Sequence, residues 1–479
     1  MKQIKSYATK YFKFIFLTFA VAIVPLVSGC DPSNTGYIVN LEIWGIKDDS
    51  TVYNEIINQY KNINPYAGDI KYRKFSESTY KQELLDALAS GNGPDIFMIN
   101  NAWLPSFQSK IEAAPALLAS ELDLRNNFPD SVASDFIADK VVYALPLAMD
   151  SMVLYYNKDM FNAAGITEPP KTWQEFDSAV EKLTMVDSVG NIIRAGAAIG
   201  TAQNVNMSSD LLSLLMMQHG VQFPTDKNMR AKFDEGVLGP DGTVVQAGER
   251  ALAYYTKFSR VSDSGNVANK LYTWNSRQKD SLEAFSEGTV GMMFSYYSRY
   301  DDIKSKNPKL NFGVAPVPQF DSNKPITLAN YWGYAVSKNK IASTQTVGQQ
   351  PSAPVTNGIR THEAWQFLRF LTLKNTGKVK LYNAITRNSG EFAINFDPAL
   401  EYLKKTNLPA ARRDLIELQK MDPVLSVFSQ GNLIAKNWYQ KDPDSVVKIM
   451  KTTIEAVNRG ELTLHEALVL AKNRVNSSN

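Results

Sequence analysis

Side chains that could catalyse a reaction or hold a metal are few in this sequence. Among 479 residues there are three histidines, His219, His362 and His465, and one cysteine, Cys30. These leave little for a zinc or cysteine–histidine site. The 48 acidic residues form many possible pairs, but no G-x-S-x-G, H-E-x-x-H or phosphate-loop motif singles out a reaction. We therefore expect a protein that is not an enzyme and that uses neither a metal nor a cofactor.

Residues that could bind a ligand follow two predicted strands. Residues 38–44 and 95–99 are β-rich segments in an alternation of strands and amphipathic helices, which is typical of a parallel sheet. Trp44 ends the first of these strands, and Asn100 and Asn101 follow the other. Ligands bind beyond the carboxyl ends of parallel strands. The topology therefore places these three side chains at a binding edge.

Length and composition are those of an ordinary globular chain. At about 100–200 residues per domain, the chain has room for two to four domains. Hydrophobic residues make up 44% and charged residues 21%, which excludes a mostly disordered chain, a coiled coil and a polytopic membrane protein. Four lysines lie in the first 29 residues, which leaves 47 basic and 48 acidic residues in the rest. This nearly neutral body argues against nucleic acid as a partner.

Residues 1–29 are typical of a lipoprotein signal peptide. Lysines are the only charges at its start, and the apolar run at residues 14–28 is short for a membrane-spanning helix. The run ends in LVSGC at residues 26–30, which resembles the lipobox in which a cysteine receives diacylglycerol. We expect Cys30 to be lipidated and residues 30–37 to form a tether that holds the body on the cell membrane, outside the cytoplasm. A plain secretion signal or membrane anchor is the alternative.

A series of motifs runs along nearly the whole remaining chain in a recognisable order. They are LEIWG at 41–45, SGNGPDIF at 90–97, YALPLAMDSMVLYYNKDMF at 143–161, AGITEPPKTWQEF at 164–176, FSEGTVGMMFSYYS at 285–298, FGVAPVPQ at 312–319, YWGYAVSKNK at 331–340, HEAWQFLRFLT at 362–372, LPAARRDL at 408–415 and GELTLHEALVLAKNRVN at 460–476. In this order and spacing, the chain resembles the extracellular solute-binding proteins of sugar ABC importers, the group that includes the maltose-binding protein.

The resemblance implies an α/β fold of two lobes, the type II periplasmic-binding-protein fold. Each lobe would be a mainly parallel sheet flanked by helices, and hinge strands would cross between the lobes. The first lobe would comprise residues 38–146 and about 326–386, and the second lobe residues 147–325 and about 387–479. The crossings would lie near Pro146, near 318–327 and near 384–390.

The resemblance also implies a ligand in the cleft between the lobes. The C–H faces of a sugar ring pack on aromatic rings, and its hydroxyl groups need fixed polar partners. Position and family together give the candidate ligand-binding residues Trp44, Lys47, Asp48, Asp95, Asn100, Tyr155, Trp274, Tyr296, Tyr297 and Trp332. Packing in the core is the alternative role for each aromatic residue, and a turn or cap is the alternative for Asp95.

The function that follows is that of a substrate-binding lipoprotein. A monomer would capture a carbohydrate, most simply an oligosaccharide, and deliver it to the transmembrane subunits of an ABC permease. Another polar solute, such as a polyamine, glycerol phosphate or peptide, is the first alternative. A surface glycan hydrolase and a sensor that feeds a kinase are the others.

Overall fold

The computed structural model describes residues 37–239, 242–262, 269–340 and 355–478. The predicted signal peptide, Cys30 and nearly all of the predicted tether lie outside these ranges. Within them, no helix has the length and apolar character needed to cross a membrane.

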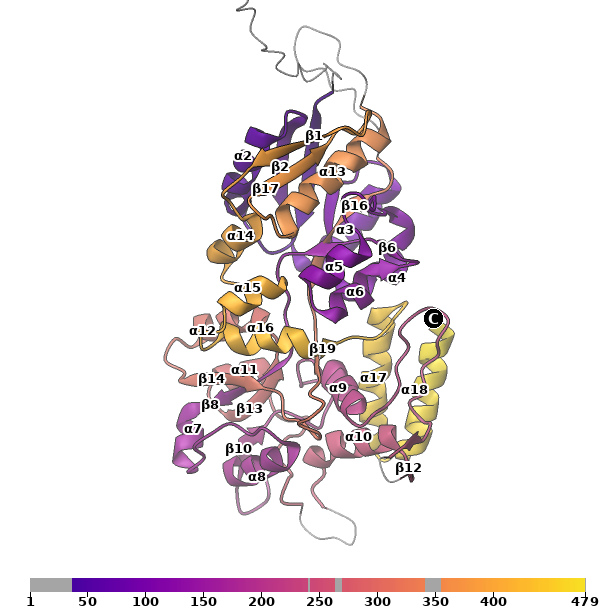
Figure 1. Ribbon diagram of the computed structural model, residues 1–479. Coiled ribbons are helices and arrows are strands. Elements are labelled where there is room, and N and C mark those ends of the chain that lie inside the picture. The colour runs from indigo at the N-terminus through magenta and orange to yellow at the C-terminus, as the bar shows by residue number, and fades with distance from the viewer. Residues whose placement is uncertain (1–36, 240–241, 263–268, 341–354, 479) are drawn as a thin grey trace, which may run out of the picture.

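The described chain forms two lobes, each built on one sheet, as Figure 1 shows. The sheet of the first lobe has the strand order β2-β1-β3-β16-β4, with β7 also paired to β16. Its strands are β1 (Val39–Gly45), β2 (Ala67–Lys74), β3 (Ile96–Asn100), β4 (Ile111–Glu112), β7 (Leu145–Pro146) and β16 (Trp332–Ser337). The sheet of the second lobe has the order β14-β8-β13-β10-β9. Its strands are β8 (Val153–Asn157), β9 (Met185–Val186), β10 (Ile192–Ala197), β13 (Val290–Ser295) and β14 (Phe312–Pro316). The expected two-lobe α/β fold is confirmed.

The sheets are mixed, and this corrects the expectation that each is mainly parallel. In the first lobe β1 runs parallel to β2 and β3, but β16 is antiparallel to its neighbours. In the second lobe only β10 and β13 are parallel, whereas β8 is antiparallel to both β13 and β14. Strands β8 and β16 enter their sheets directly from the other lobe. They do not follow a crossover helix within one lobe, so nothing forces them into the parallel direction.

Helices cover both faces of each sheet. Those of the first lobe are α2 (Asn54–Ile63), α3 (Glu77–Ala89), α4 (Leu104–Phe107), α5 (Glu121–Asn127), α6 (Asp130–Phe136), α13 (Asn357–Thr372), α14 (Pro398–Thr406) and α15 (Arg413–Leu418). Those of the second are α7 (Lys158–Ala163), α8 (Trp173–Leu183), α9 (Ser208–Gln218), α10 (Ala247–Thr256), α11 (Ser281–Ser286), α12 (Tyr300–Lys306), α16 (Leu425–Ile434), α17 (Pro443–Asn458) and α18 (Leu464–Ser478). Short 3-10 turns are η1 (Ser50–Tyr53), η2 (Asn101–Trp103), η3 (Gln108–Lys110), η4 (Lys257–Ser259) and η5 (Tyr297–Arg299).

Local sequence explains how these helices begin. Helix α8 has a capping box, because the Thr172 hydroxyl accepts the Glu175 N–H and the Glu175 carboxylate accepts the Thr172 N–H. Phe176, Val180 and Leu183 then follow at helical spacing and are buried. This face anchors the helix on the second sheet.

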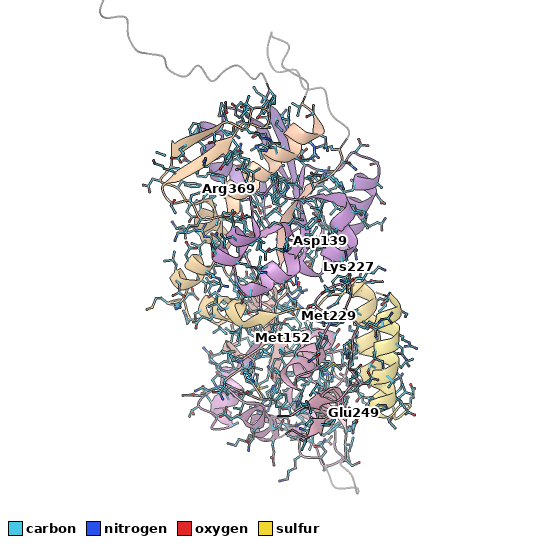
Figure 2. All side chains as sticks on the ribbon, turned by 45° about the vertical axis from the view of Figure 1, so that its right-hand side comes forward. Asp139, Met152, Lys227, Met229, Glu249 and Arg369 are labelled. Carbon is cyan, nitrogen blue, oxygen red and sulfur yellow. The ribbon has the colours of Figure 1, made fainter. Side chains whose placement is uncertain are left out.

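Four parts of the chain lie between the lobes and are bonded side by side. Residues 147–152 form the central segment: Met149 N–H donates to the Pro409 carbonyl, and Met152 N–H donates to the Leu328 carbonyl. A pair of two-residue strands, β15 (Thr327–Leu328) and β19 (Ala435–Lys436), adds the last segment. Met152 lies at the waist of the molecule in Figure 2. The lobes are therefore joined by a narrow set of hydrogen-bonded segments, about which they can bend.

The third crossing lies further along the chain than the sequence suggested. Residues 384–390 form the turn of a hairpin, β17 (Lys378–Tyr382) and β18 (Ser389–Ala393), whose residue Val379 packs in the core of the first lobe. Residues as late as Leu403 and Ile416 belong to that same core. We therefore place the third crossing between Ile416 and Leu425, not near 387. Residues 435–437 lie between the lobes but lead from α16 to α17, which both belong to the second lobe. The other small hairpins are β5 (Ile137–Ala138) with β6 (Val141–Val142) and β11 (Val237–Leu238) with β12 (Val244–Val245).

A buried carboxyl group makes the stability of the first lobe depend on pH. Glu363, only 2% exposed, accepts hydrogen bonds from Tyr37 Oη, Asn64 Nδ2 and Gln366 Nε2. Burial raises the pKa of Glu363 to about 7. Between pH 4.5 and 7 the folded chain therefore holds a proton that the unfolded chain releases, so this group's stabilising contribution is complete below pH 4.5 and falls as the pH rises.

We expect Glu363→Gln to remove this part of the pH dependence. The wild-type free energy of unfolding should lose on the order of 3 kcal/mol more than that of the variant between pH 4.5 and 8, because one pKa unit corresponds to about 1.4 kcal/mol. Urea titrations of both proteins at several pH values measure the difference. Parallel pH profiles would show that Glu363 is not the responsible group.

Candidate functional site

Two cavities lie in the cleft between the lobes and share Asn330. The larger, about 250 Å³, we call the Trp103 half; among its lining residues are Asn100, Asn101, Trp103, Asp135, Asp210, Tyr296, Trp438 and Asp444. The smaller, about 40 Å³, we call the Trp332 half; among its lining residues are Lys47, Asp150, Ser298, Tyr331, Trp332, Tyr402 and Pro409. Both halves combine residues of the two lobes with crossing segments. The cleft is therefore a candidate binding site.

Two tryptophans of the first lobe form an aromatic wall in the cleft. Trp103 ends η2, Trp332 begins β16, and their ring centroids are 4.9 Å apart with an interplanar angle of 77°. Tyr80 of α3 packs edge-on behind Trp332 at 6.1 Å. Both tryptophans are only partly buried. They thus offer two apolar surfaces at a right angle, which suits rings carrying C–H groups.

Amide groups fix the end of strand β3 beside this wall. Asn100 Nδ2 donates to Asn330 Oδ1 at 2.8 Å, and Asn100 Oδ1 accepts the Ala102 N–H at 3.1 Å. Asn101 Oδ1 accepts the Tyr331 N–H. These contacts hold the turn after β3 against the crossing segment, so that Trp103 projects into the cleft.

Asp150 lies on the central crossing segment and faces the Trp332 half. Its two carboxylate oxygens accept the N–H groups of Tyr297 and Ser298 from the second lobe, at 2.7 and 3.0 Å. Burial raises the pKa of Asp150 to about 6, although these backbone bonds and the charge of Lys47 act in the opposite direction. The carboxylate is therefore held in place for a ligand that can donate hydrogen bonds.

Two further carboxyl groups line the Trp103 half from opposite lobes. Asp135 of α6 accepts from Tyr331 Oη at 2.7 Å, from Asn437 Nδ2 at 2.7 Å and from Asn101 Nδ2 at 3.3 Å. Burial raises the pKa of Asp135 to about 6. Asp210 of α9 accepts from Tyr296 Oη at 2.8 Å, and burial raises its pKa too. Polar acceptors therefore stand on both walls.

Four of the predicted ligand-binding residues line the cleft. Lys47, Asn100, Tyr296 and Trp332 do so directly. Asp48 lies behind the cleft surface, where it is 7% exposed and accepts from Tyr53 Oη and Tyr402 Oη at 2.8 and 2.9 Å. Its role in this structure is to fix Tyr402, which lines the Trp332 half.

Four predicted aromatic contacts lie in packed interiors and line neither half. Trp44 packs on Phe75 at 4.3 Å, on the face of β1 that also carries Glu42. Tyr155, Trp274 and Tyr297 belong to one hydrophobic core of the second lobe. Strand alternation explains the result for Trp44 and Tyr155, because neighbouring side chains of a strand face opposite sides of the sheet and one side is core. Trp274 and Tyr297 lie outside the strands and are placed by tertiary packing. Tyr297 nevertheless holds the cleft through its N–H bond to Asp150.

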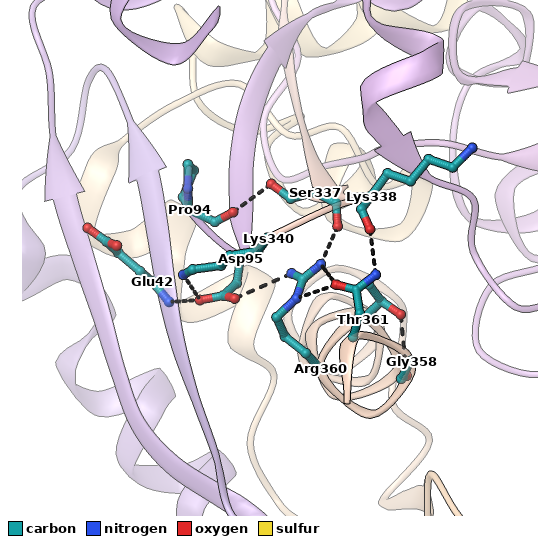
Figure 3. A network of polar contacts seen from close by, with 10 residues as sticks. Glu42, Pro94, Asp95, Ser337, Lys338, Lys340, Gly358, Arg360 and Thr361 are labelled. Atoms are coloured by element: carbon teal, nitrogen blue, oxygen red, sulfur yellow. Dashed lines mark hydrogen bonds and ion pairs between the residues drawn. The ribbon is translucent and has the colours of Figure 1, made fainter. Parts of the chain in front are cut away.

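Asp95 lies at the start of β3, whereas the cleft lies at its carboxyl end. It is 3% exposed, and Figure 3 shows it in a network with Lys340 and Arg360. Lys340 Nζ is 2.9 Å from one of its oxygens and Arg360 Nη1 is 3.3 Å from the other, while Glu42 N–H donates to it at 2.7 Å. Asp95 thus joins β1, β3, β16 and α13, and the motif that contains it is structural.

Asp135, Asp210 and Trp438 are among the cleft residues that sequence reasoning missed. Asp135 and Asp210 lie on helices, where an acidic residue is ordinarily part of a solvated face. Trp438 follows β19, a short strand between the lobes that the sequence did not indicate. A helical wheel that placed Asp210 beside the buried Leu211 and Leu214 of α9 would have been the available signal.

The described residues contain no group of three or more His, Cys, Asp or Glu side chains that could hold a metal ion. The carboxylates of the cleft are instead matched with amide, hydroxyl and backbone donors. The arrangement suits the binding of an uncharged or cationic solute by hydrogen bonds and stacking.

Comparison with known proteins finds similarity to solute-binding proteins. The family model described as bacterial extracellular solute-binding protein matches residues 46–376. A protein of Brucella abortus named as a binding protein is 24% identical over 385 residues, which cover 78% of this chain and 82% of the relative. An sn-glycerol-3-phosphate-binding periplasmic protein of Rhizobium meliloti is 24% identical over 284 residues, or 57% of this chain and 61% of the relative.

A solved structure shares the fold over nearly the full length. The cyclic alpha-maltosyl-1,6-maltose binding protein from Arthrobacter globiformis superposes with a TM-score of 0.66 at 18% identity. The match covers 92% of this chain and 99% of that protein.

Proposed function

This chain belongs to the bacterial extracellular solute-binding protein family, and from that premise we propose that it captures a carbohydrate, most simply an oligosaccharide, between its lobes. The observation that carries the proposal is the pair Trp103 and Trp332, two aromatic faces in a cleft whose remaining lining is rich in hydrogen-bonding groups. Stacking would supply much of the affinity, and the fixed polar groups would supply the specificity. The solute leaves unchanged, since its capture needs no chemistry.

The name of the Arthrobacter structure, a maltosyl-maltose binding protein, supports this ligand class. The name of the Rhizobium relative supports an organic phosphate instead. The charge of the side chains that line the cleft favours a carbohydrate over an organic phosphate. The cleft is lined by Asp135, Asp150, Asp210 and Asp444, with Lys47 as the lysine of the lining. A phosphate would be repelled there, because anion sites need clustered cations or free backbone N–H groups.

Calorimetry with defined ligands tests the proposal. Neutral and amino oligosaccharides, sn-glycerol 3-phosphate and spermidine are titrated into the purified protein, and each mixture is then analysed for cleavage products. We expect saturable heat with a saccharide and no product. Binding of glycerol phosphate or spermidine alone would replace the carbohydrate by another solute. Turnover of a glycan would establish a hydrolase.

Delivery to a permease follows from the two-lobe geometry. The narrow set of hydrogen-bonded segments between the lobes permits bending, and a ligand that contacts both lobes favours the closed state by those additional contacts. We propose that the closed form docks on the transmembrane subunits of an ABC importer, with one lobe on each subunit. The protein would act as a monomer, since the cleft needs residues of one chain only.

We also propose that a lipid on Cys30 holds the protein on the outer face of the cell membrane. In the source bacterium, Cys30→Ser should move the protein from the membrane fraction to the medium or periplasm, because two or three acyl chains give stable anchoring and none remain in the variant. Fractionation with immunodetection measures this. A variant that stays with the membrane would remove the lipobox interpretation and favour an uncleaved anchor.

A further inference from the structure

The Trp103 half of the cleft is lined by an acidic group from each lobe. Asp135 comes from α6 of the first lobe and Asp210 from α9 of the second, and both line the same cavity of about 250 Å³. The hydrogen-bond partners of Asp135 are Tyr331, Asn437 and Asn101, and that of Asp210 is Tyr296. All these partners are uncharged. Both carboxylates thus have their geometry fixed without being neutralised.

The charged neighbours of these groups leave the cavity acidic. Asp444 also lines it and is paired with Lys81, whose Nζ is 2.7 Å from Asp444 Oδ2. Lys451 of α17 is the cation whose charge acts on Asp210. Burial works against both free carboxylates, since it raises the pKa of each. A buried carboxylate is destabilised unless a cation approaches it.

Lys81 places an ammonium group beside this half of the cleft. Its Nζ lies 5.2 Å from the ring centroid of Trp103 and 2.7 Å from Asp444 of the opposite lobe. An ammonium on an aromatic face is a favourable contact. The side chains of Lys81 and Asp444 are 34% and 70% exposed, so this pair lies at the rim of the cavity.

We propose that the ligand is an amino saccharide whose protonated amine binds between Asp135 and Asp210. The inference rests on the carbohydrate proposed above and narrows it. A sugar ring on Trp103 would bring a ring substituent to the acidic walls, and an ammonium there donates hydrogen bonds to both carboxylates. Charge-assisted bonds of this kind are about twice as strong as neutral ones.

The same two carboxylates would also make closure of the lobes depend on the amine of the ligand. Two carboxylates on separate lobes repel each other as the lobes approach, whereas an ammonium between them is attracted by both. A neutral saccharide leaves the repulsion in place. The amine therefore favours the closed state by a contact that exists only when both walls are close.

Matched disaccharides test this directly. The β-1,4-linked glucosamine disaccharide and cellobiose differ in the groups at C2, ammonium in one and hydroxyl in the other. In calorimetry on the full-length protein we expect the amino form to bind at least about tenfold more tightly, as one charge-assisted bond implies. Asp210→Asn, which keeps an acceptor for Tyr296, should remove about tenfold of the affinity for the amino form and a clearly smaller part of the affinity for cellobiose. Asp130→Asn is the control: it lies on the same helix as Asp135, and its side chain is 90% exposed.

The outcomes separate this inference from the proposed function. Equal affinity for the two disaccharides, or tighter binding of cellobiose, overturns the amine preference and leaves a carbohydrate-binding protein. Binding of spermidine without any saccharide overturns both. Absence of binding by the amino disaccharide while another neutral oligosaccharide binds also overturns the inference. An Asp210→Asn variant that loses cellobiose and the amino form equally would assign Asp210 to cleft architecture.

Discussion

Trp274→Ala should lower the free energy of unfolding by about 3–5 kcal/mol, the cost of removing a buried tryptophan from a packed core. Trp274 is fully buried and lies with Tyr155, Phe285 and Phe428 in the second lobe. The cavity left behind could not be filled, because the surrounding side chains belong to β8, β13, α11 and α16, which are held by their own hydrogen bonds. Chemical denaturation followed by circular dichroism measures the loss.

The companion variant Trp274→Phe separates packing from ligand contact. It keeps an aromatic ring in the core and should bind ligand as the wild type does. If Trp274→Phe lost ligand affinity while both variants kept their stability to within about 1 kcal/mol, the ring would have to face the ligand, and the second core would be wrongly described.

Trp332→Ala should weaken ligand binding by about 1–3 kcal/mol, or about 5- to 150-fold in Kd. The ring is partly exposed in the Trp332 half of the cleft and supported by Trp103 and Tyr80. Its removal deletes a stacking surface without opening a buried core. Calorimetry with the best saccharide provides the Kd, and a thermal melt without ligand shows whether the fold is retained.

Phe320→Ala provides the matched control. Phe320 is 39% exposed on the second lobe, packed against His219 and Trp173 and away from both halves of the cleft. It should change thermal stability but not the Kd. A Trp332→Ala protein with unchanged affinity and lowered stability would show that Trp332 is a packing residue, and the aromatic wall would then reduce to Trp103.

Sequence patterns predicted the architecture better than they predicted the site. Motif order correctly indicated a two-lobe α/β fold, and the Pro146 region correctly indicated the first crossing, because the segment that follows Leu147 pairs with both neighbouring segments between the lobes. The third crossing depends on packing between distant segments. Ala399, Leu403 and Ile416 belong to one core with residues that lie hundreds of positions earlier, such as Ile43 and Ile56, and no local pattern indicates such contacts.

The predicted site residues likewise differ in whether topology or tertiary packing fixes their positions. Lys47, Asn100 and Trp332 line the cleft because they follow or begin strands, and strand ends are fixed by topology. Tyr155 faces the core because an aromatic residue in a strand can face either side, and the side is decided by the register of the sheet. Trp274 lies outside the strands and helices, and its burial is decided by tertiary packing. Asp95 pairs with Lys340 and Arg360, which lie 245 and 265 residues later in the chain, and no pattern around residue 95 indicates these partners.

The most direct test of the account is the distance between the two lobes, measured by pulsed electron spin resonance. It shows whether the lobes close when a carbohydrate binds. Spin labels are placed at Asp130→Cys at the start of α6 in the first lobe and at Lys227→Cys in the second lobe, in a Cys30→Ser background. Figure 2 labels Lys227. We predict a broad distance distribution without ligand that becomes shorter and narrower when the saccharide identified by calorimetry saturates the protein. A distribution that stays the same under saturating saccharide would contradict closure around the ligand.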